Sequence, residues 1–324
     1  MAGQPNQSTQ QNRTLPKSLT GGASLRGRIV LFGCTWSGHP LGSLILAMQP
    51  DGSGLETVLE LRDGQGISAG RVAPDGRRLA LGVSQGDSQR MDVWLLDVNG
   101  RLRKIIDDAM VQAWSPDGRR LACTRGVGRP WQSFLLDAAT GKEHSLPLPK
   151  TELVLDWSPD GRWLAVMSYP DKNFQHPSKG TYALRKIGLV KPDGSGREDL
   201  KADPLLDNIR PRFSPDSKRL VYFQPKHREG RVLHDAVVYE LDGSGAREML
   251  DFNTVFQGNH QFKSEGFPCW SPDGKQFCWL VPLQRTATSP IKMELVFVSP
   301  TTGLQKRLDL DELGIRFAST MDWR

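Results

Sequence analysis

Hydrophobic residues along this chain gather in short runs that are separated by turn residues. The segments at 119–123, 162–167 and 218–223 either alternate apolar and polar side chains or are largely apolar, and they are rich in strand-forming residues. This pattern predicts β-strands. No run approaches the roughly 18 apolar residues that a membrane-spanning helix needs, so we expect an all-β protein without a transmembrane helix.

One turn motif recurs five times, and each copy precedes such a strand. Its common form is aromatic-Ser-Pro-Asp-Gly, in which Pro takes the second turn position, where its fixed φ fits. Successive prolines are 42, 43, 56 and 57 residues apart, and a basic period near 42 residues is typical of a propeller blade. The copies lie at 72–76, 114–118, 157–161, 213–217 and 270–274.

A second turn, rich in Asp and Gly, occurs six times between predicted third and fourth strands. The unit therefore has four strands, and the unequal counts indicate that the two ends of the chain share one blade. Residues 28–32 have the pattern of a second strand, and residues 319–324 have that of a first strand. We predict an all-β, six-bladed β-propeller with four antiparallel strands per blade, whose ring is closed by the C-terminal strand joining the N-terminal blade.

These repeats resemble the TolB-type β-propeller, which is built of WD40-like repeats, and the resemblance covers roughly residues 25–324. Proteins named TolB carry a signal and an additional N-terminal α/β domain, and this chain shows neither. The resemblance therefore implies the propeller alone, and a role with cell-envelope partners is not carried over.

Residues 1–24 form a polar tail that we predict to be disordered. The tail has no apolar stretch that could form the core of a signal peptide, which predicts a cytoplasmic protein. A true start further upstream would make the protein periplasmic or secreted.

The four cysteines lack the spacing of a zinc site or of a disulfide framework, and we expect small buried hydrophobic residues. They are Cys34, Cys123, Cys269 and Cys278. A tight turn at 271–274 would pair Cys269 with Gln276. Cys278 would then lie opposite Phe267, so that the two sulfurs are diagonal and form no disulfide.

The repeated residues themselves are best explained by structure. Each motif Asp can bond its own turn backbone, and the five copies lie on different blades, which disfavours a ring of metal ligands. The aromatic residue before each turn fits packing between blades. The chain also lacks a Gly-x-Ser-x-Gly nucleophile motif and the Gly-Lys-Ser/Thr end of a phosphate loop. We therefore predict no catalytic residue, no bound metal and no cofactor.

The later blades carry longer connections, and these are the best candidates for a site, because loops on a rigid scaffold often carry function. Three join second to third strands and one joins two blades, and both kinds emerge on the same face of a propeller, called the loop face below. Together they hold nine basic and four acidic residues, with aromatic residues among them. The connections are 169–185, 224–234, 251–265 and 282–292.

A basic, aromatic-containing loop face suits an acidic protein or peptide or an anionic saccharide, and nucleic acid is a less favoured partner. The alternative that these are solvated loops without a partner stays open, as does metal binding by some of the histidines. We expect a monomer. The candidate ligand-binding residues are His176, Lys179, Arg185, Lys226, His227, Arg228, Arg231, His260, Lys263 and Arg285.

The sequence therefore favours a non-catalytic propeller that acts as a binding scaffold through the loop face of blades 4 to 6. The alternative is a metal-dependent lyase of oligouronate chains, since some propellers cleave uronate sugars with a metal, His and Arg on one face. A third possibility is a domain of a larger assembly. Fold alone does not decide among them.

Overall fold

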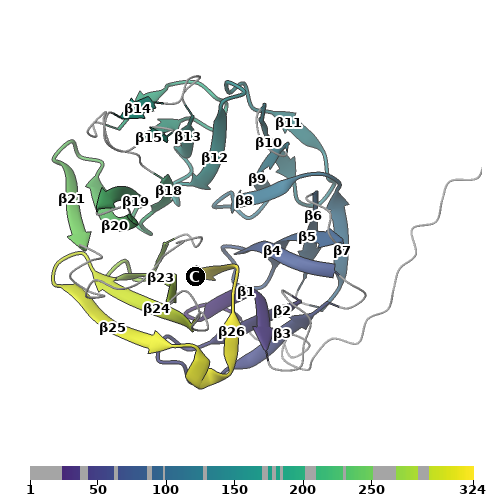
Figure 1. The fold of residues 1–324 in the computed structure, drawn as a ribbon. Helices are drawn as coiled ribbons and strands as arrows, with labels where there is room; N and C mark the ends of the chain where they lie inside the picture. The colour runs from purple at the N-terminus through teal and green to yellow at the C-terminus, as the bar shows by residue number, and fades with distance from the viewer. Residues whose placement is uncertain are drawn as a thin grey trace, which may run out of the picture.

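The computed structural model places six antiparallel sheets as blades around a central axis (Figure 1). It describes residues 24–36, 43–61, 65–85, 90–97, 99–126, 130–169, 174–176, 180–182, 185–200, 209–228, 231–250, 268–283 and 292–324. The predicted all-β, six-bladed architecture is confirmed. The predicted tail at 1–24 lies almost wholly outside the described residues.

The strands of each blade follow one another from the axis outward. Blade 1 contains β27 (Thr320–Trp323), β1 (Ile29–Trp36), β2 (Leu44–Met48) and β3 (Glu56–Glu60). Blade 2 contains β4 (Gln65–Val72), β5 (Leu79–Gln85), β6 (Met91–Leu96) and β7 (Leu102–Ile106). Blade 3 contains β8 (Met110–Trp114), β9 (Arg120–Arg125), β10 (Gln132–Asp137) and β11 (Glu143–Ser145).

The second half of the ring repeats this order. Blade 4 contains β12 (Glu152–Trp157), β13 (Leu164–Ser168), β16 (Lys186–Val190) and β17 (Glu198–Asp199). Blade 5 contains β18 (Ile209–Phe213), β19 (Arg219–Arg228), β20 (Arg231–Glu240) and β21 (Gly245–Leu250). Blade 6 contains β22 (Cys269–Trp270), β23 (Phe277–Leu283), β24 (Lys292–Ser299) and β25 (Gly303–Asp309).

Four short elements complete the description. A separate hairpin, β14 (Phe174–His176) and β15 (Gly180–Tyr182), lies between β13 and β16 in the chain. A single turn of 3-10 helix, η1 (Asp311–Leu313), precedes β26 (Ile315–Phe317). Within the described part of the chain, no helix has the length and apolar character of a membrane span.

The ends of the chain close the ring in blade 1, as the turn counts predict. Strand β27 pairs antiparallel with β1, with Ile29 opposite Trp323 and Phe32 opposite Thr320. Strand β26 pairs with the far end of β1. The backbone N–H of Gly27 donates to the carbonyl of Arg324. The two ends therefore meet where the other blades have their Pro-Asp turn, and the C-terminus lies near the axis (Figure 1).

The Pro-Asp turns are held by their own side chains. In blade 3, Ser115 Oγ donates to Asp117 Oδ1 at 2.6 Å, and the N–H of Arg119 donates to the same oxygen at 3.0 Å. These two bonds lower the pKa of Asp117. Gly118 closes the turn with φ of 65°, a conformation that favours glycine. Equivalent backbone bonds hold Asp75, Asp160, Asp216 and Asp273, and the motif Ser adds its Oγ bond in all but Asp75, which confirms the structural role of these residues.

The aromatic residues before these turns pack between neighbouring blades, also as predicted. Trp114 Nε1 donates to the carbonyl of Arg71 in blade 2 at 3.1 Å, and the Arg78 guanidinium lies 5.0 Å from the Trp114 ring. Blades 5 and 6 repeat this arrangement, in which Trp270 Nε1 donates to the carbonyl of Arg212 and Arg219 lies over the ring. Buried apolar side chains of adjacent blades fill the space between the sheets.

The predicted register around the Cys269–Cys278 hairpin is wrong. Cys269 lies directly opposite Cys278, and Trp270 lies opposite Phe277. The reason is that Ser271 N–H donates to the carbonyl of Gln276 at 2.8 Å, so the loop includes one residue beyond the Ser-Pro-Asp-Gly turn. Neither cysteine is in a disulfide, both are buried, and burial raises the pKa of each thiol.

Candidate functional site

Each innermost strand carries a variable residue immediately before the aromatic position of its repeat, and these six residues form an inner ring. Adjacent first strands contact one another all the way around the axis, so the ring positions lie at the centre of the molecule. The inner-ring residues of blades 1 to 6 are Asp322, Arg71, Ala113, Asp156, Arg212 and Cys269.

Five inner-ring residues line a cavity of about 360 Å³, called the channel pocket below. Its rim includes four prolines of the Pro-Asp turns, Pro74, Pro159, Pro215 and Pro272. The pocket therefore opens on the face where first and second strands join, called the turn face, which is opposite to the loop face. Four arginines and two aspartates line it, so the charges of the lining side chains sum to +2.

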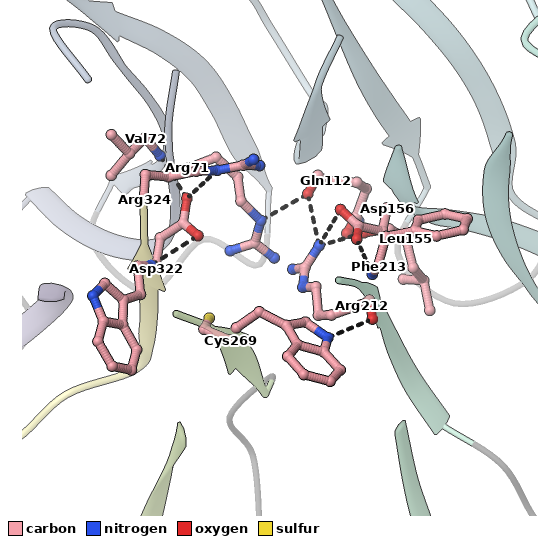
Figure 2. Close-up of polar contacts among 12 residues, drawn as sticks. Arg71, Val72, Gln112, Leu155, Asp156, Arg212, Phe213, Cys269, Asp322 and Arg324 are labelled. Carbon is pink, nitrogen blue, oxygen red and sulfur yellow. Dashed lines mark hydrogen bonds and ion pairs between the residues drawn. The ribbon is translucent and has the colours of Figure 1, made fainter. Parts of the chain in front are cut away.

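In blades 4 and 5, Asp156 and Arg212 form a buried ion pair (Figure 2). Arg212 Nη1 lies 3.1 Å from Asp156 Oδ1 and donates to the carbonyl of Leu155 at 2.8 Å. The N–H of Phe213 donates to Asp156 Oδ2 at 2.8 Å. Because burial of an unpaired charge is costly, this full set of partners is what holds Asp156 in place.

Blades 1 and 2 show the same arrangement with one change. Asp322 Oδ2 accepts from the N–H of Val72 at 2.8 Å, as Asp156 does from Phe213. The change concerns Arg71, which donates to the carbonyls of Gln112 and Gly70, each at 2.7 Å. Arg324 pairs loosely with the carboxylate of Asp322, with Nε 3.8 Å from Asp322 Oδ2 (Figure 2).

The environment of Asp156 makes its carboxyl group sensitive to pH. Burial raises the pKa of Asp156 to about 6, although the charge of Arg324, the N–H of Phe213 and the charge of Arg71 each lower it. Removal from water therefore outweighs the neighbouring positive charges. The Arg324 charge acts from blade 1 on a carboxyl in the opposite blade, so the two blades interact electrostatically across the channel.

The predicted loop-face residue Arg185 lies in a small aromatic cluster. Its guanidinium is 5.7 Å from the Tyr169 ring, and Tyr169 packs against Trp131 at 4.6 Å. The three side chains are half-buried, and their contacts link the β9–β10 connection of blade 3 to the β13–β16 connection of blade 4. Sequence analysis named Arg185 but not Trp131, which precedes a third strand in an ordinary-length connection.

Four predicted residues lie on the β19–β20 hairpin, and the register brings them together. The backbones of Arg228 and Arg231 are directly opposite, His227 faces Val232, and Lys226 is opposite Leu233. His176 lies on β14 opposite Gly180. The remaining candidates lie outside the described residues, and they are Lys179, His260, Lys263 and Arg285.

The side chains that line the channel pocket can bind anions. No group of three or more His, Cys, Asp or Glu side chains in the described ranges could hold a metal ion. Burial raises the pKa of all four thiols, so they are poor nucleophiles. The guanidinium groups of the channel pocket, by contrast, can pair with carboxylate or other oxyanions.

Comparisons with known proteins address the fold. No protein-family model matches this sequence, and no curated protein matches it. TolB from Acinetobacter baumannii superimposes with a TM-score of 0.67 at 16% sequence identity, over 93% of this chain and 67% of that one. The fold is that of a TolB-like six-bladed β-propeller.

More distant structures share parts of this TolB-like propeller. A prolyl endopeptidase matches with a TM-score of 0.53 at 14% identity, over 88% of this chain and 48% of that one, so this chain spans about half its length. An oligogalacturonate lyase in complex with manganese matches with a TM-score of 0.49 at 14% identity, over 88% of this chain and 74% of that one. These likenesses concern the fold alone.

The inner ring of the TolB-like propeller is the feature that sequence analysis missed. The signal was present, because the position before each motif aromatic holds two Arg and two Asp among its six residues. Charged residues are unusual at the end of a buried strand. Arg324 also stands where most other repeats have the motif Ser, which places a cation beside the pocket.

Proposed function

We propose that this protein is a non-catalytic binding module that holds an anionic partner on the loop face of blades 4 to 6. The observation that carries the proposal is the β19–β20 hairpin. Its strands are ten residues long, whereas the equivalent strands of blade 4 have five. The extra ladder ends in the Arg228–Arg231 pair, with Lys226 two residues before Arg228.

The pairing of β19 with β20 matters because it fixes the backbone of this basic segment on the blade. Three cationic residues within one short hairpin create a local positive potential, which attracts an anionic partner and raises its rate of association. The folding of a regular hairpin does not require several residues of like charge. Like charges directly opposite one another destabilise the pairing of two strands. A binding role supplies a reason for them.

The aromatic cluster on blades 3 and 4 also favours a binding role for the loop face. Arg185 is held over Tyr169, and Tyr169 over Trp131, so a cation and two rings are fixed at the start of β16. Aromatic and Arg side chains are enriched in binding surfaces. The partner class that fits is an acidic peptide segment or an anionic saccharide.

The test compares two charge-matched triple variants. One, called the loop-face variant, replaces Arg228, Arg231 and Arg285, three of the residues that the sequence predicts for the loop-face site, with Ala. The other replaces Arg162, Lys218 and Lys275, which follow the Pro-Asp turns on the turn face. The probes are a polyglutamate peptide and an oligogalacturonate, measured by calorimetry at low salt.

We expect the loop-face variant to lose at least about tenfold in affinity for the probe that binds, a loss of about 1.4 kcal/mol. The turn-face variant should keep its affinity, and both should melt as the parent does. Equal losses in the two variants would show non-specific charge attraction and overturn the proposal. Metal-dependent release of unsaturated uronate from the saccharide, followed by ultraviolet absorbance, would replace it with the lyase alternative.

A further inference from the structure

We propose that the channel pocket on the turn face is a second binding site, which takes a small organic carboxylate. It is separate from the loop-face site of the proposed function, and neither depends on the other. The pocket combines an apolar rim, a positive lining and a size suited to a small molecule.

The dimensions and the lining fit such a ligand. A volume of about 360 Å³ lies at the lower end of the range of about 300–1,000 Å³ that is typical of small-molecule sites, which suits a short or aromatic acid. The four rim prolines and the rings of Trp157, Trp270 and Trp323 supply apolar contact. Small-molecule sites commonly have such an apolar lining with a few convergent polar groups.

Arg324 is the side chain best placed to receive the carboxylate. It is half-buried, its Nε has no hydrogen-bond partner among the described residues, and its ion pair with Asp322 is long at 3.8 Å. Arg26 lies at the rim and donates to the carbonyl of Pro74 at 3.1 Å. Arg71 and Arg212 are buried and bond to backbone carbonyls, so they supply positive charge at the base of the pocket.

The indole N–H of Trp157 is a second hydrogen-bond donor that favours a ligand in the channel pocket. Trp157 is only 7% exposed, lines the pocket, and has an Nε1 without a partner in the described part of the chain. The equivalent nitrogen atoms of Trp114, Trp270 and Trp323 all donate to backbone carbonyls. A buried donor without a partner is costly, and the carboxylate of a pocket ligand would supply an acceptor.

Binding at this site should strengthen as the pH falls through about 6. The charged and titratable groups around Asp156 are Arg212 on β18, Arg71 on β4, Arg324 and Asp322 at the end of β27, and Cys269 on β22. Protonation of Asp156 removes one negative charge and leaves the arginines in place. The pocket then attracts an anion more strongly.

The first experiment measures binding of phenylacetate to the full chain by calorimetry, at pH 7.5 and pH 5.5, where the probe stays ionised. Inorganic sulfate is the comparison anion. We expect saturable 1:1 binding of phenylacetate that is weakened at least about tenfold by Arg324→Gln. The matched control is Arg162→Gln, because Arg162 lies on the same face, has a side chain 73% exposed, and does not line the pocket.

Two inner-ring variants test the pH dependence. Asp156→Asn should bind phenylacetate more tightly at pH 7.5 and lose most of the difference between the two pH values. Asp322→Asn changes the charge equally on the opposite blade but should keep that difference. The absence of saturable binding, an equal loss in the two arginine variants, or tighter binding of sulfate than of phenylacetate would each overturn the assignment. None of these outcomes bears on the loop-face probes.

Discussion

The carboxylate of Asp322 accepts a hydrogen bond from the backbone N–H of Val72 at 2.8 Å, although 250 positions separate the two residues. Asp156 makes the same bond to Phe213 on the opposite side of the ring. In each case, an inner-ring Asp of one blade bonds to the first strand of the next blade (Figure 2). These bonds join blade 1 to blade 2 and blade 4 to blade 5 next to the channel.

Asp322→Ala should therefore weaken the closure of the ring. The change leaves the buried N–H of Val72 without its acceptor, which costs about 1–3 kcal/mol in the free energy of unfolding. Urea denaturation measures this loss. Asp242→Ala is the control, because Asp242 lies in an exposed turn and accepts a hydrogen bond from Ser244 in the same turn. Equal stability of the Asp322 variant and the parent would show that Asp322 does not support ring closure.

The architecture could be predicted from the sequence because the turns that define it are local. Pro, Asp and Gly set the backbone of each Pro-Asp turn with bonds that span two to five residues. Their spacing gave the blade count, and the missing sixth turn gave the composite blade that β1 and β27 form. No knowledge of distant contacts was needed.

The channel pocket could not be found in the same way, because its residues are related only through the ring. Arg71, Asp156 and Asp322 occupy one repeat position, yet that position holds four different residue types across six blades. A search for recurring residues passes over a position that varies. The pairing of Asp156 with Arg212 also depends on the neighbouring blade, which periodicity alone does not show.

The tryptophans of the repeats provide a matched test of the bonds between blades. Trp114→Phe removes the N–H that donates to the Arg71 carbonyl, and it leaves that buried acceptor short of a partner. Trp157→Phe removes a similar volume but takes away a donor that has no partner among the described residues. We expect Trp114→Phe to reduce the free energy of unfolding by about 1 kcal/mol more than Trp157→Phe does. The opposite order would contradict the role given to the Trp114 bond.

The raised pKa of Asp156 predicts a specific pH dependence of stability. Its pKa of about 6 in the folded protein exceeds the unfolded value of about 3.9, so the folded state binds more protons between these values. This group therefore adds stability below about pH 4, and the contribution is lost as the pH rises through about 6. In the Asp156→Asn variant, this loss of stability with rising pH should be absent.

The pKa of Asp117 is shifted in the opposite direction, so this residue serves as the reference in that experiment. Hydrogen bonds from Ser115 and Arg119 lower the pKa of Asp117, so it adds stability above about pH 4. That contribution is lost as the pH falls. The measurement is the free energy of unfolding in urea from about pH 2 to pH 7 for the parent and for Asp156→Asn and Asp117→Asn. Parallel curves for the parent and Asp156→Asn would rule out the titration of Asp156 in this range.

Gly70 on β4 lies where blade 2 approaches blade 1 too closely for a side chain. A Cβ atom at this position would overlap the ring of Phe32, a fully buried residue of β1. Gly70→Ala should therefore cost about 1–3 kcal/mol through overpacking, measured by thermal and urea unfolding. Gly82→Ala on the adjacent strand is the control, since its nearest contact would be an ordinary 3.6 Å. Combining Gly70→Ala with Phe32→Leu should recover part of the loss, and the absence of any recovery would contradict the steric explanation.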